Sequence, residues 1–125
     1  MAKSSLTPPS YSRFLFRMVN YLKPKTILEM GTCFGISSLY LYLPNTQTKM
    51  TTMEGCPNVA QIAKNSFSQM KANNLKLVNA PFDLALPEVL ESYEQLDLLF
   101  VDGNHKREPT LFYFCLLYTS DAADE

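Results

Sequence analysis

The sequence lacks several features that would assign a protein to a class at once. It has three cysteines without a Cys-x-x-Cys pair and a single histidine, so neither a disulfide framework nor a zinc site is expected. No apolar run approaches the roughly 18 residues of a membrane span, and the amino terminus has no signal-peptide core. Its 11 basic and 12 acidic residues give no electrostatic case for nucleic acid or a membrane surface. We therefore expect a cytoplasmic protein whose thiols stay reduced.

What the sequence does contain is enough apolar material for one folded unit. Hydrophobic residues make up 46% of the 125 residues, a share that supports a real core in a single domain of this length. Residues 1–9 are polar and include Pro8-Pro9, so we expect them to form a flexible lead-in. The folded domain is expected to span residues 10–114.

The stretch of residues 26–43 organises the rest of the chain. Residues 26–30 form a short, almost continuous apolar run, which is typical of a parallel strand covered on both faces. Gly31 and Gly35 then bracket a sharp turn, and Pro44 ends the helical periodicity that follows. The first turn of that helix offers backbone N–H groups to an anionic or strongly polar ligand. Its buried face should comprise Ile36, Leu39, Tyr40 and Leu43.

The spacing of the glycines narrows the choice of ligand. A dinucleotide-binding turn has the pattern Gly-x-Gly-x-x-Gly, whereas this turn has Glu29, Gly31 and Gly35, with Cys33 where a middle glycine would stand. The pattern Glu-x-Gly-Thr-x-x-Gly resembles motif I of the class I S-adenosylmethionine-dependent methyltransferases, particularly the small O-methyltransferase-like branch. That resemblance implies a cofactor site at this turn, with further partners at the ends of the following strands.

An acidic residue follows the next predicted strand. Residues 49–53 are rich in threonine, as expected of a strand, and they lead to Glu54-Gly55. Glu54 follows Gly31 at about the 20-residue offset at which a carboxylate can accept hydrogen bonds from both ribose hydroxyls of a bound nucleoside. Nicotinamide and sulfonium cofactors both contain a ribose whose hydroxyls need such an acceptor. Glu54 therefore indicates a bound nucleoside but does not distinguish the two cofactors.

Strands and helices continue to alternate along the chain. The periodicities predict helices over residues 10–22, 57–72 and 84–93, an edge strand at residues 75–78 and a central strand at residues 96–101. The first helix should bury Tyr11, Phe14, Leu15, Met18, Tyr21 and Leu22, and the last should bury Leu86, Val89 and Leu90. Such an alternation gives a parallel sheet by the right-handed crossover rule.

The resemblance to methyltransferases makes this α/β pattern more specific. It implies a Rossmann-like parallel sheet with helices on both faces and strand order 3-2-1-4, incomplete at its carboxyl-terminal side. Ligands of such sheets bind at the carboxyl ends of the strands, near the switch point. The implied cofactor is S-adenosyl-L-methionine, with Asn79, Ala80 and Phe82 near its adenine. The complete set of implied cofactor-binding residues is Glu29, Gly31, Thr32, Cys33, Gly35, Glu54, Gly55, Asn79, Ala80, Phe82 and Asp102.

The segment after the last predicted strand bears on the reaction. Asp102-Gly103-x-His105 is similar to the motif after strand four of O-methyltransferase-like proteins, where an acidic residue and often a histidine face the methyl donor. Asp102 and His105 are therefore the candidate catalytic residues, with His105 as a general base toward a small-molecule hydroxyl acceptor. Asp102 is also the sole candidate ligand for a divalent metal, but one carboxylate does not make a metal site.

Two other functions stay open. A nicotinamide-dependent oxidoreductase of the Rossmann type would share Glu54 but is disfavoured by the missing Gly-x-Gly-x-x-Gly. A Rossmann-like fragment without catalytic activity is the other alternative, because a chain that ends after strand four leaves an unpaired apolar strand edge. We expect the full-length protein to be a methyltransferase and the 125-residue chain itself to be inactive. The methyl acceptor and the oligomeric state do not follow from the sequence.

Residues 115–125 interrupt the helical pattern that begins at Thr110. They resemble, residue for residue, the translated end of a transposon adapter used in preparing DNA sequencing libraries, and such segments are excluded from the fold. We predict that the native sequence breaks off near Phe114 and that the codons for residues 115–125 match the adapter. The nucleotide sequence of the gene tests this, and codons that differ from the adapter would refute it.

Overall fold

The structure, a computed structural model, describes residues 9–101. The helices are α2 (Pro9–Leu22), α3 (Ile36–Tyr42), α4 (Pro57–Gln69) and α5 (Phe82–Glu91). The strands are β1 (Thr26–Met30), β2 (Lys49–Glu54), β3 (Leu75–Asn79) and β4 (Leu98–Val101). The predictions for residues 1–8, Asp102, His105 and residues 110–125 concern positions outside the described residues.

The four strands form one parallel sheet in the order β3-β2-β1-β4. The predicted order 3-2-1-4 is therefore confirmed, and β3 is an edge strand whose Lys76 is exposed, as expected. At the centre of the sheet Glu29 of β1 lies beside Thr52 of β2 on one side and Phe100 of β4 on the other. Because all four strands are parallel, their carboxyl ends meet at one edge of the sheet, and the turn after β1 lies there.

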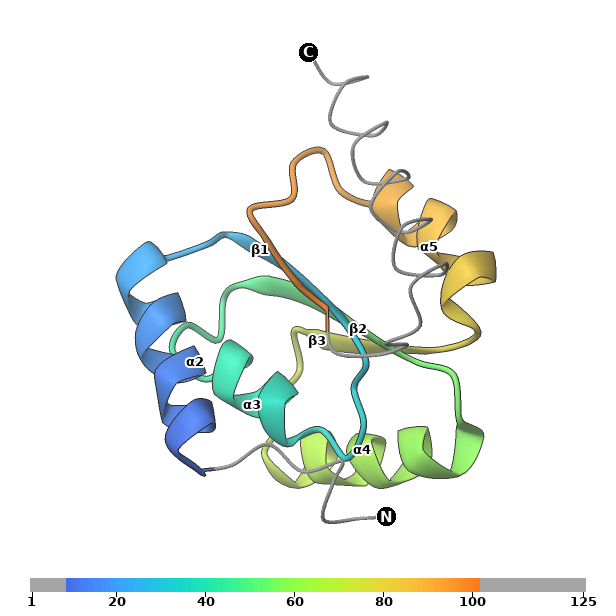
Figure 1. The fold of residues 1–125 in the computed structure, drawn as a ribbon, viewed down its shortest axis with the longest axis horizontal. Helices are drawn as coiled ribbons and strands as arrows, with labels where there is room; N and C mark the ends of the chain where they lie inside the picture. The colour runs from blue at the N-terminus through green and yellow to red at the C-terminus, as the bar shows by residue number, and fades with distance from the viewer. Residues whose placement is uncertain (1–8, 102–125) are drawn as a thin grey trace.

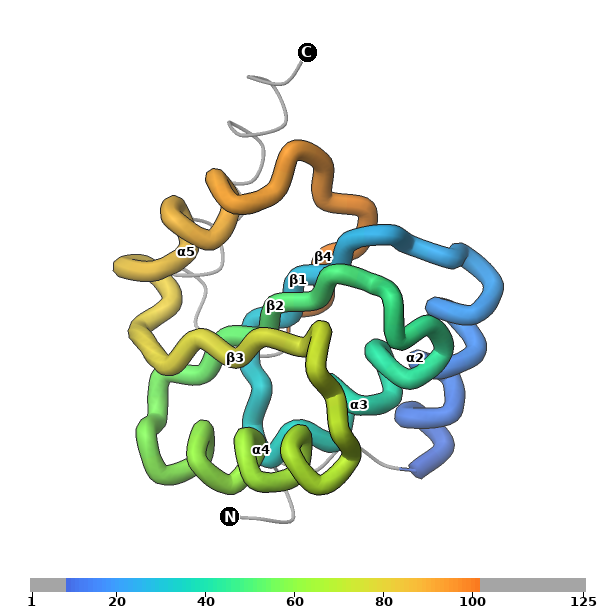
Figure 2. The backbone as a smooth tube through the Cα atoms, turned by 180° about the vertical axis from the view of Figure 1, so that it is seen from behind, coloured from blue at the N-terminus to red at the C-terminus, as the bar shows by residue number. Residues whose placement is uncertain are grey.

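Helices cover both faces of the sheet, as Figures 1 and 2 show: α2, α3 and α4 lie on one side and α5 on the other. The core under α2, α3 and α4 includes Leu15, Leu41, Met50 and Phe67. The core under α5 includes Leu28, Met30, Leu86, Val89 and Leu90, which confirms the predicted inward face of that helix. Each such side chain contributes about 1.5–3 kcal/mol when it is fully buried. Among the helices described between residues 9 and 101, none is long and apolar enough to cross a membrane.

The buried face of α2 differs from the predicted one. Its buried residues are Ser12, Leu15 and Val19. Four of the six residues predicted to be buried are instead exposed: Tyr11, Phe14, Tyr21 and Leu22. The rings of Tyr11 and Phe14 stack on one another with centroids 6.2 Å apart, and Tyr11 also lies 6.4 Å from the ring of Phe100. The two aromatic residues thus pack beside β4, and the narrower stripe with Leu15 and Val19 enters the core.

The buried face of α3 also differs from the predicted one. The structure buries Ser37, Ser38, Leu41 and Tyr42, whereas Ile36 and Leu43 are 39% and 37% exposed. The reason is electrostatic, because the buried carboxylate of Glu29 needs hydrogen-bond donors and both serine hydroxyls supply them. The need of the Glu29 carboxylate for hydrogen-bond donors therefore sets which side of this helix faces the sheet, and it outweighs the apolar periodicity of the helix.

Tyr93, just after α5, makes the stability of the fold depend on pH. Its hydroxyl lies 2.5 Å from Thr51 Oγ1 and 3.5 Å from the carbonyl oxygen of Ile27. Burial raises the pKa of the Tyr93 phenol above its ordinary value of 10.0, and the hydrogen bonds with Thr51 oppose that rise only in part. Above pH 10 the phenol of the unfolded chain therefore ionises first. The unfolded state then binds fewer protons than the folded state, so stability falls as pH rises.

We predict that Tyr93 adds no pH dependence to the free energy of unfolding below about pH 9. Above about pH 10 its ionisation in the unfolded chain should lower that free energy by at most about 1.4 kcal/mol per pH unit. Urea unfolding measured across this range tests it. Tyr93→Phe should flatten the fall, whereas Tyr21→Phe, at a position that is 85% exposed, should leave it unchanged. Parallel profiles for the wild type and Tyr93→Phe would contradict the assignment.

Candidate functional site at the carboxyl edge of the sheet

The backbone of the turn after β1 explains its glycines. Gly31 and Gly35 have φ angles of 112° and 89°, which side chains disfavour. Cys33 lies between them with φ 54°, a left-handed conformation that costs a non-glycine residue about 1–2 kcal/mol. The N–H groups of Gly31 and Thr32 both donate to the carbonyl oxygen of Met53, at 2.9 and 3.0 Å. These two hydrogen bonds tie the turn to the end of β2.

Gly35 has a second role in packing. A Cβ atom at this position would lie 2.8 Å from Cε1 of Phe67 and 3.3 Å from Cβ of Ala63. Both residues belong to α4, so the missing side chain lets the start of α3 approach α4 closely. The structure thus explains Gly35 by helix packing, and its predicted contact with a cofactor stays a prediction.

Glu29 is the polar centre of this region. Its side chain is 0% exposed, and its carboxylate accepts hydrogen bonds from the hydroxyls of Ser37 (2.7 Å), Ser38 and Thr52 (2.7 Å). Thr52 Oγ1 also lies 2.6 Å from Thr32 Oγ1, so the network reaches the glycine turn. A direct contact between Glu29 and a ligand would require this network to open.

The hydroxyl residues of this network are candidates that the sequence analysis missed. Ser37, Ser38 and Thr52 are all buried, and together they satisfy the carboxylate of Glu29. A signal for them exists in the sequence, because an acidic residue inside an apolar parallel strand must find hydrogen-bond donors. The first turn of the following helix holds two adjacent serines, Ser37 and Ser38, which could supply such donors.

The carboxylate of Glu54, at the end of β2, is directed at the glycine turn. Its Oε1 accepts the N–H of Cys33 at 2.8 Å, and its Oε2 accepts the N–H of Cys56 at 3.1 Å. Its carbonyl oxygen accepts the N–H of Ala80 at 3.1 Å and the side-chain amide of Asn79 at 2.8 Å. Glu54 therefore joins the carboxyl ends of β1, β2 and β3, and its half-buried side chain leaves part of the carboxylate open to solvent.

The structure brings most of the predicted site residues to this edge. Those that lie at the carboxyl ends of β1, β2 and β3 are Glu29, Gly31, Thr32, Cys33, Gly35, Glu54, Gly55, Asn79 and Ala80. Phe82 is the first residue of α5 and packs against the core on that face, whereas Asp102 and His105 lie outside the described residues. Within residues 9–101 no group of three or more histidine, cysteine or acidic residues could hold a metal ion.

The chain folds as a Rossmann-like domain with the strand order of methyltransferases. Three features define it: the parallel sheet in the order 3-2-1-4, the glycine turn after β1 and the carboxylate at the end of β2. Residues 28–122 match the family model described as a methyltransferase domain. The chain therefore belongs to this methyltransferase domain family. No curated protein matches the sequence.

Solved structures share the fold at low sequence identity. The O-methyltransferase from Bacillus cereus, in complex with S-adenosylhomocysteine (SAH), matches 90% of this chain with a TM-score of 0.78 and 24% identity. The SAH-bound Podospora anserina methyltransferase PaMTH1 matches 94% with a TM-score of 0.85 and 23% identity. The O-methyltransferase TomG from Streptomyces achromogenes, in complex with S-adenosylmethionine and involved in tomaymycin synthesis, matches 90% with a TM-score of 0.77 and 22% identity. The chain covers only 52%, 50% and 52% of these proteins, respectively.

We predict that Gly35→Ala lowers the free energy of unfolding by about 2–4 kcal/mol. An alanine there would hold a left-handed backbone conformation, and its Cβ atom would force Phe67 to move. Urea unfolding of the purified chain measures the effect. Gly55→Ala is the matched control, because its nearest atom would be the carbonyl oxygen of Ala80 at 3.9 Å, and we expect a change within about 0.5 kcal/mol. Equal stability of the two variants would contradict the packing role of Gly35.

Proposed function

We propose that this domain binds S-adenosyl-L-methionine across the carboxyl ends of β1 and β2 and that the full-length protein transfers a methyl group to an oxygen of a small-molecule acceptor. The observation that carries the proposal is the hydrogen bond from the Cys33 N–H to the Glu54 carboxylate, which joins an acidic strand end to a glycine turn. A nucleoside cofactor needs such a carboxylate for its ribose diol, beside a glycine turn that lets the rest of the ligand approach the backbone closely. The family match and the cofactor-bound structures with this fold support the choice of cofactor.

Glu54 can accept both ribose hydroxyls without giving up its backbone partners. Each of its carboxylate oxygens accepts one N–H group, from Cys33 and from Cys56, whereas an ionised carboxylate offers about four acceptor positions. The two N–H groups also hold the carboxylate in place before a ligand arrives. Binding then loses little side-chain entropy, which favours affinity.

Glu29 acts on the ligand indirectly in this proposal. Its carboxylate holds Ser37, Ser38 and Thr52, and Thr52 in turn holds Thr32 in the turn. The hydroxyl network thereby fixes the turn in which Gly31, Thr32, Cys33 and Gly35 face the amino-acid end of the cofactor. Glu29 is thus a positioning residue, because it has no exposed surface of its own.

The end of β3 suits the adenine ring. The amide nitrogen of Asn79 donates to the carbonyl oxygen of Glu54, so its Oδ1 faces the other way and can accept a hydrogen bond from an adenine amino group. Ala80 and Phe82 are half-buried and offer apolar contact to the ring. The methyl-transfer chemistry falls to the bound cofactor, which supplies an electrophilic methyl group. Asp102, also a candidate cofactor contact, and His105 remain the candidate catalytic residues of the proposal.

Isothermal titration of the purified chain with SAH and with NAD⁺ tests the proposal. We expect SAH to bind and NAD⁺ not to bind, because the turn lacks the second glycine that lets a pyrophosphate approach. Glu54→Gln should weaken SAH binding about 10- to 100-fold, the loss expected for hydrogen bonds to a charged group. Glu88→Gln, on the exposed side of α5, is the control that makes the same change outside the site.

The result would count against the proposal if NAD⁺ bound more tightly than SAH, if neither bound, or if Glu54→Gln and Glu88→Gln had the same affinity for SAH. Urea unfolding of both variants establishes that each is folded during the titration. An affinity loss in Glu54→Gln without a loss of stability would assign the effect to the ligand contact.

A further inference from the structure

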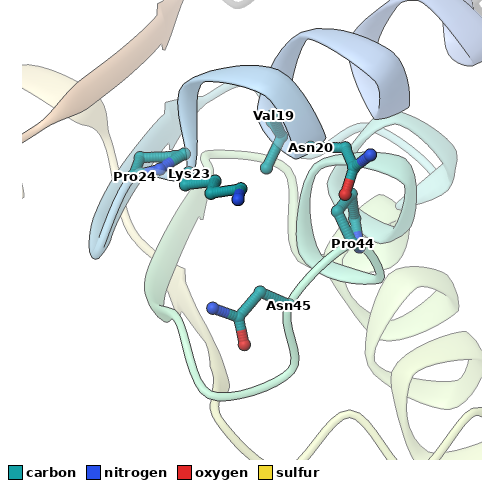
Figure 3. A pocket seen from close by; sticks show the side chains of 6 residues that line it. All are labelled: Val19, Asn20, Lys23, Pro24, Pro44 and Asn45. Atoms are coloured by element: carbon teal, nitrogen blue, oxygen red, sulfur yellow. The ribbon is translucent and has the colours of Figure 1, made fainter.

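A pocket lies at the opposite edge of the sheet from the glycine turn. It has a volume of about 170 Å³ and lies between the end of α2, the start of β1 and the loop that follows α3 (Figure 3). Its lining residues are Val19, Asn20, Lys23, Pro24, Pro44 and Asn45. Because this pocket is at the amino ends of β1 and β2, the length of the sheet separates it from the candidate cofactor site.

The loop after α3 holds Asn45 in a fixed orientation. The Oδ1 atom of Asn45 accepts the N–H of Gln47 at 3.0 Å. The main chain of Asn45 donates to the carbonyl oxygen of Tyr42 at 3.2 Å and accepts the N–H of Thr48 at 3.0 Å. With Oδ1 engaged by Gln47, the side-chain nitrogen lies on the side of Lys23 in Figure 3. The pocket therefore contains an N–H donor that is oriented before any ligand arrives.

Lys23 supplies a second donor from an unfavourable backbone conformation. It follows α2 with φ 51°, and its N–H donates to the carbonyl oxygen of Val19 at 2.8 Å. Glycine usually occupies this position after a helix, because any other residue loses about 1–2 kcal/mol there. The lysine ammonium points into the pocket in Figure 3. Lys23 therefore brings a cationic donor to the pocket.

The rest of the lining is suited to the apolar part of a ligand, and it holds no group that would repel a negative charge. Val19 is 1% exposed at the floor, and Pro24 and Pro44 contribute rigid rings. The hydroxyl of Thr48 donates to the carbonyl oxygen of Pro24 at 3.3 Å, which fastens the loop to the start of β1. No acidic residue is among the six that line the pocket. A cavity of roughly 150 Å³ accommodates benzene, so this one suits a body of that size.

We propose that this pocket binds a small organic monocarboxylate. Its carboxylate lies between the Lys23 ammonium and the Asn45 amide, and its apolar body packs against Val19, Pro24 and Pro44. A carboxylate fits better than a phosphate, because the lining holds one cation and no arginine for the forked contacts that phosphates receive. The inference is independent of the proposed methyltransferase function, since the two sites share no residue.

Benzoate is the probe, and benzamide is its uncharged counterpart of nearly the same shape. Titrating each into ¹⁵N-labelled chain while following the side-chain amide signals of Asn45 and Asn20 measures binding at the pocket itself. We expect saturable shifts with benzoate and at least about tenfold weaker binding of benzamide, because the hydrogen bonds to a charged group are lost. Equal affinity for the two compounds, or no saturable shift with benzoate, would overturn the proposal.

Two substitutions separate ligand binding from folding. Lys23→Gly removes the ammonium and relieves the left-handed strain, so we expect at least about tenfold weaker benzoate binding without loss of stability. Lys25→Gln makes the same change of charge at an exposed position outside the pocket and should retain the affinity. Unchanged benzoate affinity in Lys23→Gly would disprove the site, and inorganic phosphate that binds as tightly as benzoate would disprove the ligand class.

Discussion

The buried carboxylate of Glu29 constrains everything around the glycine turn. An ionised group without exposed surface costs several kcal/mol unless donors surround it, and Ser37, Ser38 and Thr52 are those donors. Their requirement rotates α3 so that its serines face the sheet and Ile36 faces solvent. The start of α3 and the turn before it are therefore held in one arrangement by charge rather than by apolar packing alone.

Glu54 extends that arrangement across the sheet. Through its carboxylate and its carbonyl group it binds the backbone after β1 and the end of β3 at the same time. The two glutamates thus have different roles. Glu29 stabilises the turn from the interior, whereas Glu54 leaves part of its carboxylate accessible to solvent. A preorganised edge of this kind is what a nucleoside cofactor requires, and membership of the methyltransferase domain family agrees with it.

The two edges of the sheet differ in chemistry because they differ in which backbone groups they expose. The carboxyl edge combines a glycine turn, where the backbone can be approached closely, with the acceptor carboxylate of Glu54, which suits a ligand with hydroxyl donors. The amino edge receives the end of α2 and the loop before β2, and these bring the donors Lys23 and Asn45 over an apolar floor. The carboxyl edge and the pocket at the amino edge therefore favour ligands of different chemistry.

Local patterns in the sequence determined the order of helices and strands along the chain, the parallel sheet and the position of Glu54, because strand and helix periods, turn residues and chain offsets all act over short distances. The spatial strand order 3-2-1-4 was implied by the resemblance to methyltransferases, not by those local patterns. The tertiary structure decided which side of α2 and α3 is buried, since that depends on the neighbours that the fold supplies: Phe100 beside Tyr11, and Glu29 beneath Ser37 and Ser38. It also decided the partner of the Asn79 amide and the pocket at Lys23 and Asn45. Those contacts join residues distant in the chain, and no local period encodes them.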